Sequence, residues 1–162
     1  MKYRKLQTGF TVIELILVIA ILSLVFALIS FNWVASLPKQ NLNSAVEVLV
    51  ADLKQQQLEA MVGIDSGGGG LMNHGIYFNT NEYITYEGSS YNVSNSSNIQ
   101  FSLPQGITVS TSDITSDDLV FAHTSGEPTT IGVNPQIIIT NQANNIQKTI
   151  QLNQLGVVVS IN

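Results

Sequence analysis

The chain has no cysteine, one tryptophan, four prolines and six basic residues among its 162 residues. The lack of cysteine excludes a disulfide-stapled scaffold and thiolate chemistry. No Gly-x-Ser-x-Gly nucleophile motif occurs either. Charged residues make up 10% of the chain, and apolar residues make up 44%. We therefore expect neither an enzyme nor a cofactor, and the remaining function classes are structural and binding proteins.

Positive charge is concentrated at the start of the chain. Lys2, Arg4 and Lys5 are half of all the basic residues. After residue 9, three lysines stand against eleven Asp and Glu residues, which gives a formal charge of −8. Because nucleic-acid binding needs Lys and Arg to neutralise phosphates, an acidic body disfavours nucleic acid as a partner.

A long uncharged run follows these basic residues. No charged residue occurs from Leu15 to Pro38, a stretch of 24 residues. A helix of this length extends about 36 Å, which exceeds the roughly 30 Å hydrocarbon core of a membrane. The basic residues before the run predict a cytoplasmic N terminus and an extracytoplasmic C-terminal body.

Three interpretations of this segment are open. A cleaved signal peptide could end near Val34-Ala35-Ser36, but the apolar run exceeds the roughly 7–15 residues of such a peptide's core. A plain signal anchor leaves Glu14, a carboxylate at the start of the run, without a role. The third interpretation accounts for the basic residues, Gly9, Phe10 and Glu14 together.

The stretch Gly9-Phe10-Thr11-Val12-Ile13-Glu14-Leu15 resembles the recognition sequence of type IV prepilins and pseudopilins. That family has a short basic leader ending in Gly, then an apolar residue, a Glu at the fifth position after the Gly, and a long apolar helix. The resemblance implies cleavage between Gly9 and Phe10 by a prepilin peptidase and N-methylation of Phe10. It also implies partners: other pilin or pseudopilin subunits in a filament, and an inner-membrane assembly platform.

Glu14 is expected to set the register of that assembly. An unpaired carboxylate within a membrane is costly, so it points to a functional partner at similar depth. Cleavage after Gly9 creates such a cation, the α-amine of Phe10 on a neighbouring subunit. The alternative is that Glu14 reaches the lipid headgroups beside Lys5, since it lies only one turn inside the helix.

A weaker likeness concerns the subgroup. The segment "LVADLKQQQLEAM" resembles the minor pseudopilin H and FimT-like group. That group often carries an Arg where Gln55 to Gln57 stand here. Many major pilins have a proline in the second half of the membrane helix, whereas the first proline here is Pro38. This difference argues against a major pilin.

The resemblance implies a minor pilin or pseudopilin of a type II secretion pseudopilus or a type IV pilus. Such a protein is a single-pass protein of the bacterial inner membrane, with its C-terminal domain outside the cytoplasm, and then joins a filament in the periplasm or at the cell surface. The alternative function is a membrane-anchored extracytoplasmic β-domain that binds a ligand or cell-wall component outside any filament.

The expected fold class is α+β, pilin-like, with one long helix on a mainly antiparallel β-sheet domain. The expected segments are a cleaved leader (1–9), a membrane helix (10–37), an amphipathic second half (38–63) and a β-rich domain (64–162). Pro38 would end or kink the helix near Ser36-Leu37, or lie in the first turn of a continuing helix. An apolar stripe then predicts packing on the sheet, and Gly63 ends the helix; the stripe comprises Leu42, Val46, Leu49, Leu53 and Ala60.

Short β-rich runs follow a Gly-rich connector at 64–73, which lacks the Lys-Ser/Thr of a phosphate-binding loop. They predict strands at 74–79, 82–88, 98–103, 106–111, 118–123, 135–140, 147–152 and 155–161. Tight connections between neighbouring strands are expected at 79–81, 104–106 and 153–154.

Metal-binding candidates are few. His74 and His123 are the only histidines, and neither has a second ligand at a metal-binding spacing, so surface or loop positions are expected. Asp113, Asp117 and Asp118 form a loose acidic cluster. Their spacing lacks the alternation of a calcium loop, so a solvated turn is expected rather than a calcium site.

Overall fold

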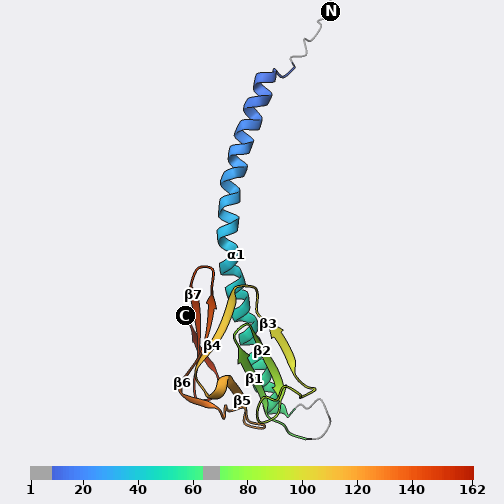
Figure 1. Cartoon of the computed structure of the whole chain (residues 1–162), viewed down its shortest axis with the longest axis vertical. Helices are drawn as coiled ribbons and strands as arrows, with labels where there is room; N and C mark the ends of the chain where they lie inside the picture. The colour runs from blue at the N-terminus through green and yellow to red at the C-terminus, as the bar shows by residue number, and fades with distance from the viewer. Residues whose placement is uncertain (1–8, 64–69) are drawn as a thin grey trace, which may run out of the picture. The chain divides into compact units, whose positions relative to one another are not determined.

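The computed structural model describes residues 9–63 and 70–162, with residues 28–40 described by their backbone alone. Helix α1 spans Val12–Val62 (Figure 1). The other elements are β1 His74–Asn79, β2 Glu82–Glu87, β3 Ile99–Ser102, β4 Ile107–Ile114, the 3-10 helix η1 Thr115–Asp117, β5 Asp118–Phe121, β6 Ile131–Asn141, β7 Ile146–Leu152 and β8 Val158–Ile161. The chain divides into two compact units, Met1–Leu37 and Pro38–Asn162.

Helix α1 continues through Pro38 as one element. Of the alternatives expected at Pro38, an end of the helix near Ser36-Leu37 is excluded; the helix continues, although Pro38 lies in its interior rather than in its first turn. A proline removes a single N–H donor, and helical turns on both sides can supply the remaining hydrogen bonds.

Part of the predicted membrane segment, 10–37, lies outside the described residues, because the side chains of residues 28–40 are not described. Across the parts of the chain that the structure does describe, no helix combines the length and the apolar character needed to cross a membrane.

The predicted apolar stripe on the second half of α1 is confirmed. Its members are all buried: Leu42, Val46, Leu49, Leu53 and Ala60. Ala45 and Gln56 are buried on the same face. The helix ends as predicted at Gly63, which adopts a φ of 72° and donates its N–H to the Glu59 carbonyl at 2.9 Å.

All eight predicted strands are present, and they form two four-stranded antiparallel sheets. Sheet A has the order β3-β2-β1-β5, and sheet B has the order β4-β6-β7-β8. The predicted β-domain with one long helix is thus confirmed. Its division into two sheets was not predicted.

Two of the three predicted connections join paired strands. Residues 79–81 connect β1 to β2, and 153–154 lie between β7 and β8. The connection at 104–106 instead joins β3 to β4, which lie in different sheets. The two sheets are tied together where Val109 on β4 donates its N–H to the Thr80 carbonyl at 2.9 Å.

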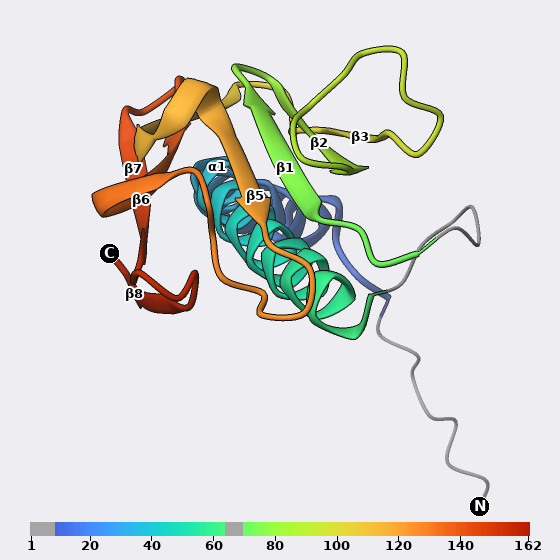
Figure 2. The same ribbon diagram turned by 90° about the horizontal axis from the view of Figure 1, so that it is seen from below.

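One core cluster fills the space between the sheets and the second half of α1. Figure 2 shows β1 and β5 passing over this part of the helix. The largest buried side chains come from all three elements and include Leu49, Leu53, Ile76, Phe121, Ile137 and Ile150. Burial of these side chains supplies the main stabilisation of the Pro38–Asn162 unit.

The outer face of sheet A is covered by the loop between β2 and β3. Tyr91 of this loop stacks on Tyr77 with ring centroids 4.3 Å apart. Beneath it, the Tyr86 hydroxyl donates to Asp118. Gly75 leaves room for the Tyr86 ring, because a Cβ there would lie 2.4 Å from Tyr86 Cζ. A side chain at position 75 would therefore displace a buried tyrosine.

Candidate processing site and a buried polar cluster

The residues at the predicted cleavage site lie just before helix α1. Gly9 and Phe10 are outside any helix or strand and are exposed, and α1 begins at Val12. Phe10 is 90% exposed, and among the described residues other than its chain neighbours no atom lies within 4 Å of the position that a Cβ on Gly9 would take. A peptidase can bind this segment without unwinding the helix.

Thr11 and Glu14 form a capping box at the start of α1. The Thr11 backbone N–H and hydroxyl both donate to Glu14 Oε2 at 2.8 Å. The Glu14 N–H in turn donates to Thr11 Oγ1 at 3.3 Å. Such reciprocal bonds satisfy N–H groups that have no partner within the helix. A carboxylate in the first turn also stabilises the positive end of the helix dipole.

The first turns of α1 carry exposed apolar side chains. Every large apolar residue from Val12 to Phe26 is between 44% and 76% exposed. Between Val12 and Phe26 the only hydroxyl side chain is that of Ser23. It donates to the Ile19 carbonyl at 2.8 Å, so its hydrogen bond is made within the helix. A helix that is apolar all round needs an apolar environment or neighbouring helices to cover it.

Polar contacts hold the second half of α1 on the β-domain. The Tyr83 hydroxyl on β2 donates to Asp52. The Gln57 amide donates to the carbonyls of Gly126 at 2.9 Å and Leu155 at 2.7 Å. Gln57 lies in the Gln55 to Gln57 stretch, so this part of the helix has a structural function that the sequence did not reveal.

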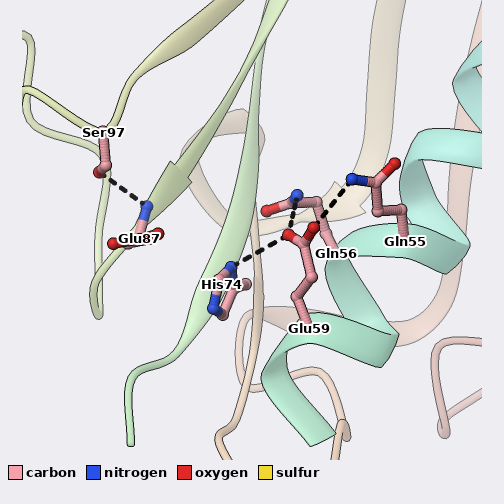
Figure 3. Close-up of polar contacts among 6 residues, drawn as sticks. All are labelled: Gln55, Gln56, Glu59, His74, Glu87 and Ser97. Carbon is pink, nitrogen blue, oxygen red and sulfur yellow. Dashed lines mark hydrogen bonds and ion pairs between the residues drawn. The ribbon is translucent and has the colours of Figure 1, made fainter. Parts of the chain in front are cut away.

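A third polar contact centres on Glu59 (Figure 3). Gln55 donates to Glu59 Oε1 at 2.8 Å, and Gln56 donates to Glu59 Oε2 at 2.7 Å. His74 Nδ1, at the start of β1, lies 3.5 Å from the same Oε2. Glu87 pairs with His74 across the strands, and its N–H donates to Ser97 Oγ at 3.2 Å.

The prediction that His74 is a surface or loop residue is wrong. His74 is 2% exposed, because it shares the inward face of β1 with Ile76 and Phe78, toward α1. The second histidine, His123, is exposed and follows β5, where its Nδ1 contacts Asn73 Oδ1 at 2.9 Å, so the prediction is confirmed there.

A small polar pocket of about 120 Å³ lies beside Glu59 and His74. Nevertheless, within the described residues no group of three or more His, Cys, Asp or Glu side chains could hold a metal ion. The cluster fixes the end of α1 on β1: a buried imidazole and a buried amide both face one carboxylate, which avoids the cost of leaving them unpaired.

The three aspartates of the acidic cluster have separate partners. Asp113 accepts the Asn134 N–H at 2.9 Å, and Asp117 accepts the Thr111 hydroxyl. Asp118 accepts bonds from Tyr86 and, at 3.1 Å, from the Tyr91 N–H. The carboxylates therefore serve local turn and sheet contacts.

The structure places the predicted residues Gly9, Phe10 and Glu14 within one exposed segment at the start of α1. It adds Thr11, which the sequence interpretation missed although Thr-x-x-Glu is the sequence signature of a capping box. The cluster around His74 was also missed. Its partners are distant in sequence, and only the buried polar Gln56 within the apolar stripe could have indicated it.

Comparison with known families finds one match. Residues 4–30 match the model of the prokaryotic N-terminal methylation motif. Comparison with curated proteins and with solved structures finds no match.

This match supports a protein of the type IV pilin or pseudopilin class. The motif implies processing by a prepilin peptidase, membrane anchoring and assembly with other pilins. The family that this motif defines is structural rather than enzymatic.

Proposed function

We propose that the chain is a minor pilin or pseudopilin that is built into a type II secretion pseudopilus or a type IV pilus. The observation that carries this proposal is the methylation motif at residues 4–30, which lies across the start of α1. In this proposal residues 1–9 are a leader that a prepilin peptidase removes, residues 10–37 are the membrane and assembly segment, and the β-domain is extracytoplasmic.

Processing is supported by the geometry of the segment. Hydrolysis of the Gly9–Phe10 bond needs an extended, accessible backbone, and both residues lie outside the helix. The new Phe10 α-amine would then accept one methyl group. Thr11 keeps its backbone N–H after this cut, so the capping box with Glu14 survives processing.

Register setting by Glu14 is compatible with the cap. Both hydrogen bonds from Thr11 reach Oε2, and within the described residues Oε1 has no hydrogen-bond partner. Glu14 can therefore cap its own helix and pair through Oε1 with the Phe10 α-amine of a neighbouring subunit. Such a pair fixes the axial position of one helix against the next.

The exposed apolar side chains from Val12 to Phe26 support a helix that is covered first by lipid and then by neighbouring subunits. Assignment to the pseudopilin H and FimT-like group rests on the likeness of the segment from Leu49 to Met61.

The test uses Glu14→Ala and Glu14→Gln chains expressed in cells that assemble the filament. Glutamine retains an oxygen for the cap but lacks the charge that pairs with an amine. We expect both variants to insert into membranes and both to be lost from sheared filaments by at least tenfold.

Glu47→Ala is the matched control, since Glu47 is an exposed carboxylate on the same helix. This variant should enter filaments at the wild-type level. Normal incorporation of Glu14→Gln would show that Glu14 acts only as a cap, and normal incorporation of both Glu14 variants would exclude any assembly role. If wild-type protein stays entirely in the membrane, the anchored β-domain alternative is favoured.

A further inference from the structure

A pocket of about 380 Å³ lies where the end of β1 in sheet A meets β4 in sheet B. This volume falls in the range of small-molecule sites, roughly 300–1,000 Å³. Phe78 and Val109 are among its lining residues, and their side chains are buried in the hydrophobic core. The rest of the lining is an aromatic ring and five small polar side chains: Tyr77, Asn79, Thr80, Ser110, Thr111 and Asp117.

Several polar groups in this lining are available to a ligand. In the described part of the chain, the hydroxyls of Tyr77, Thr80 and Ser110 make no hydrogen bond. Asp117 accepts the Thr111 hydroxyl through Oδ1, and its Oδ2 has no partner among the described residues. The pocket thus offers three hydroxyls, each a donor and an acceptor, and one carboxylate oxygen that only accepts.

The aromatic member of the lining is rigid. The Tyr77 ring stacks on Tyr91 with an interplanar angle of 6°, and Tyr91 is held by the bond from its N–H to Asp118. A ring fixed in this way offers an apolar surface without the entropy loss of ordering a mobile side chain on binding.

Asp117 is held in its position at a conformational cost. Ser116 and Asp117 both have a φ of 56°, in the left-handed region that non-glycine residues rarely adopt. Strained backbone of this kind is found preferentially at binding and catalytic sites. This turn directs a carboxylate to a pocket that already has an aromatic wall.

We propose that this pocket binds a neutral saccharide. None of its lining residues is a Lys, Arg or His, so an anionic ligand would lack a counter-charge. Hydroxyls, an amide and a carboxylate are suited to the hydroxyl groups of a sugar, and the Tyr77 ring is suited to the apolar face of a sugar ring. The site lies within the Pro38–Asn162 unit and does not depend on filament assembly.

The test measures binding of two neutral tetrasaccharides, chitotetraose and maltotetraose, to the full chain in detergent micelles. Saturation-transfer NMR detects weak binding, and titration gives the affinity. We expect at least one of the two sugars to bind. Ser110→Trp fills the pocket from an exposed position on β4 and should weaken binding at least tenfold.

Ser112→Trp is the matched control, because Ser112 is an exposed residue of the same strand outside the pocket lining. This variant should bind as the wild type does. Asp117→Asn, which tolerates a positive φ, should weaken binding at least threefold even if Ser110→Trp fails to fold. Binding of neither sugar, binding that Ser110→Trp leaves unchanged, or binding of oligolysine alone would overturn the proposal.

Discussion

Thr11 and Glu14 hold each other at the N terminus of α1, with three hydrogen bonds between them and every one at 3.3 Å or less. An unpaired carboxylate at the start of an apolar run would be energetically costly. The Glu14 carboxylate instead already accepts hydrogen bonds from Thr11 of its own chain. Because the bonds from Thr11 use one carboxylate oxygen, the cap and a contact to a neighbouring subunit do not compete for the same atom.

Removal of the Thr11 hydroxyl should fray the start of α1. Loss of a capping side chain costs about 1 kcal/mol, which corresponds to roughly fivefold faster amide exchange where local opening controls exchange. We expect Thr11→Val to show this increase at residues 13–15 in hydrogen-exchange measurements on the full chain in detergent. Thr11→Ser retains the hydroxyl and should exchange at the wild-type rate. Equal rates in both variants would contradict the capping role.

Replacement of His74 by alanine should destabilise the β-domain by about 2–4 kcal/mol. The substitution opens a cavity and deprives the Glu59 carboxylate of a facing donor. Chemical denaturation of the full chain, followed by circular dichroism, measures the change.

The other histidine is the control for this change. His123→Ala removes an exposed side chain and should alter the free energy of unfolding by no more than about 0.5 kcal/mol. Similar effects of the two substitutions would mean that the contact between His74 and Glu59 contributes little to stability.

Alkaline pH should destabilise the fold through two tyrosines. Burial and the Asp52 carboxylate raise the pKa of Tyr83, and burial and the Asp118 carboxylate raise the pKa of Tyr86. The unfolded chain releases these protons near pH 10.0, whereas the folded chain retains them. The stability is therefore fully present below pH 10.0 and falls as the pH rises above it.

Ultraviolet absorbance of tyrosinate tests this prediction. In the native chain Tyr83 and Tyr86 should remain protonated above the pH at which they ionise in the unfolded chain. The double variant Tyr83→Phe, Tyr86→Phe should lose stability less steeply above pH 10.0. An identical slope in the variant would contradict the assignment.

Local patterns predicted the elements of this fold well. The stripe from Leu42 to Ala60 and the positive-φ Gly63 follow from helix periodicity and capping, and the β1–β2 connection follows from the turn residues around Thr80. The pairing of β1 with β5 and of β4 with β6 brings together strands that are far apart in sequence. Turn chemistry carries no information on such pairing, so the division into two sheets could not be predicted.

The same distinction holds for the sites: a site formed by residues close in sequence could be predicted, and a site formed by residues from distant elements could not. Gly9, Phe10 and Glu14 lie within six residues, and this short local stretch carries the resemblance to the prepilin recognition sequence. The burial of His74 depends on Glu59, which comes from another element across the core. The pocket beside Tyr77 likewise needs two strands from different sheets, so its residues have no recognisable pattern in the chain.

The central claim, that the chain is a processed filament subunit, is tested most directly by intact-mass spectrometry of the protein recovered from sheared filaments. The account predicts a chain that begins at Phe10 and is about 14 Da heavier than the unmodified sequence 10–162, from one methyl group. A chain that begins at Met1, or one cut near Leu37 as a signal peptide would be, would contradict it.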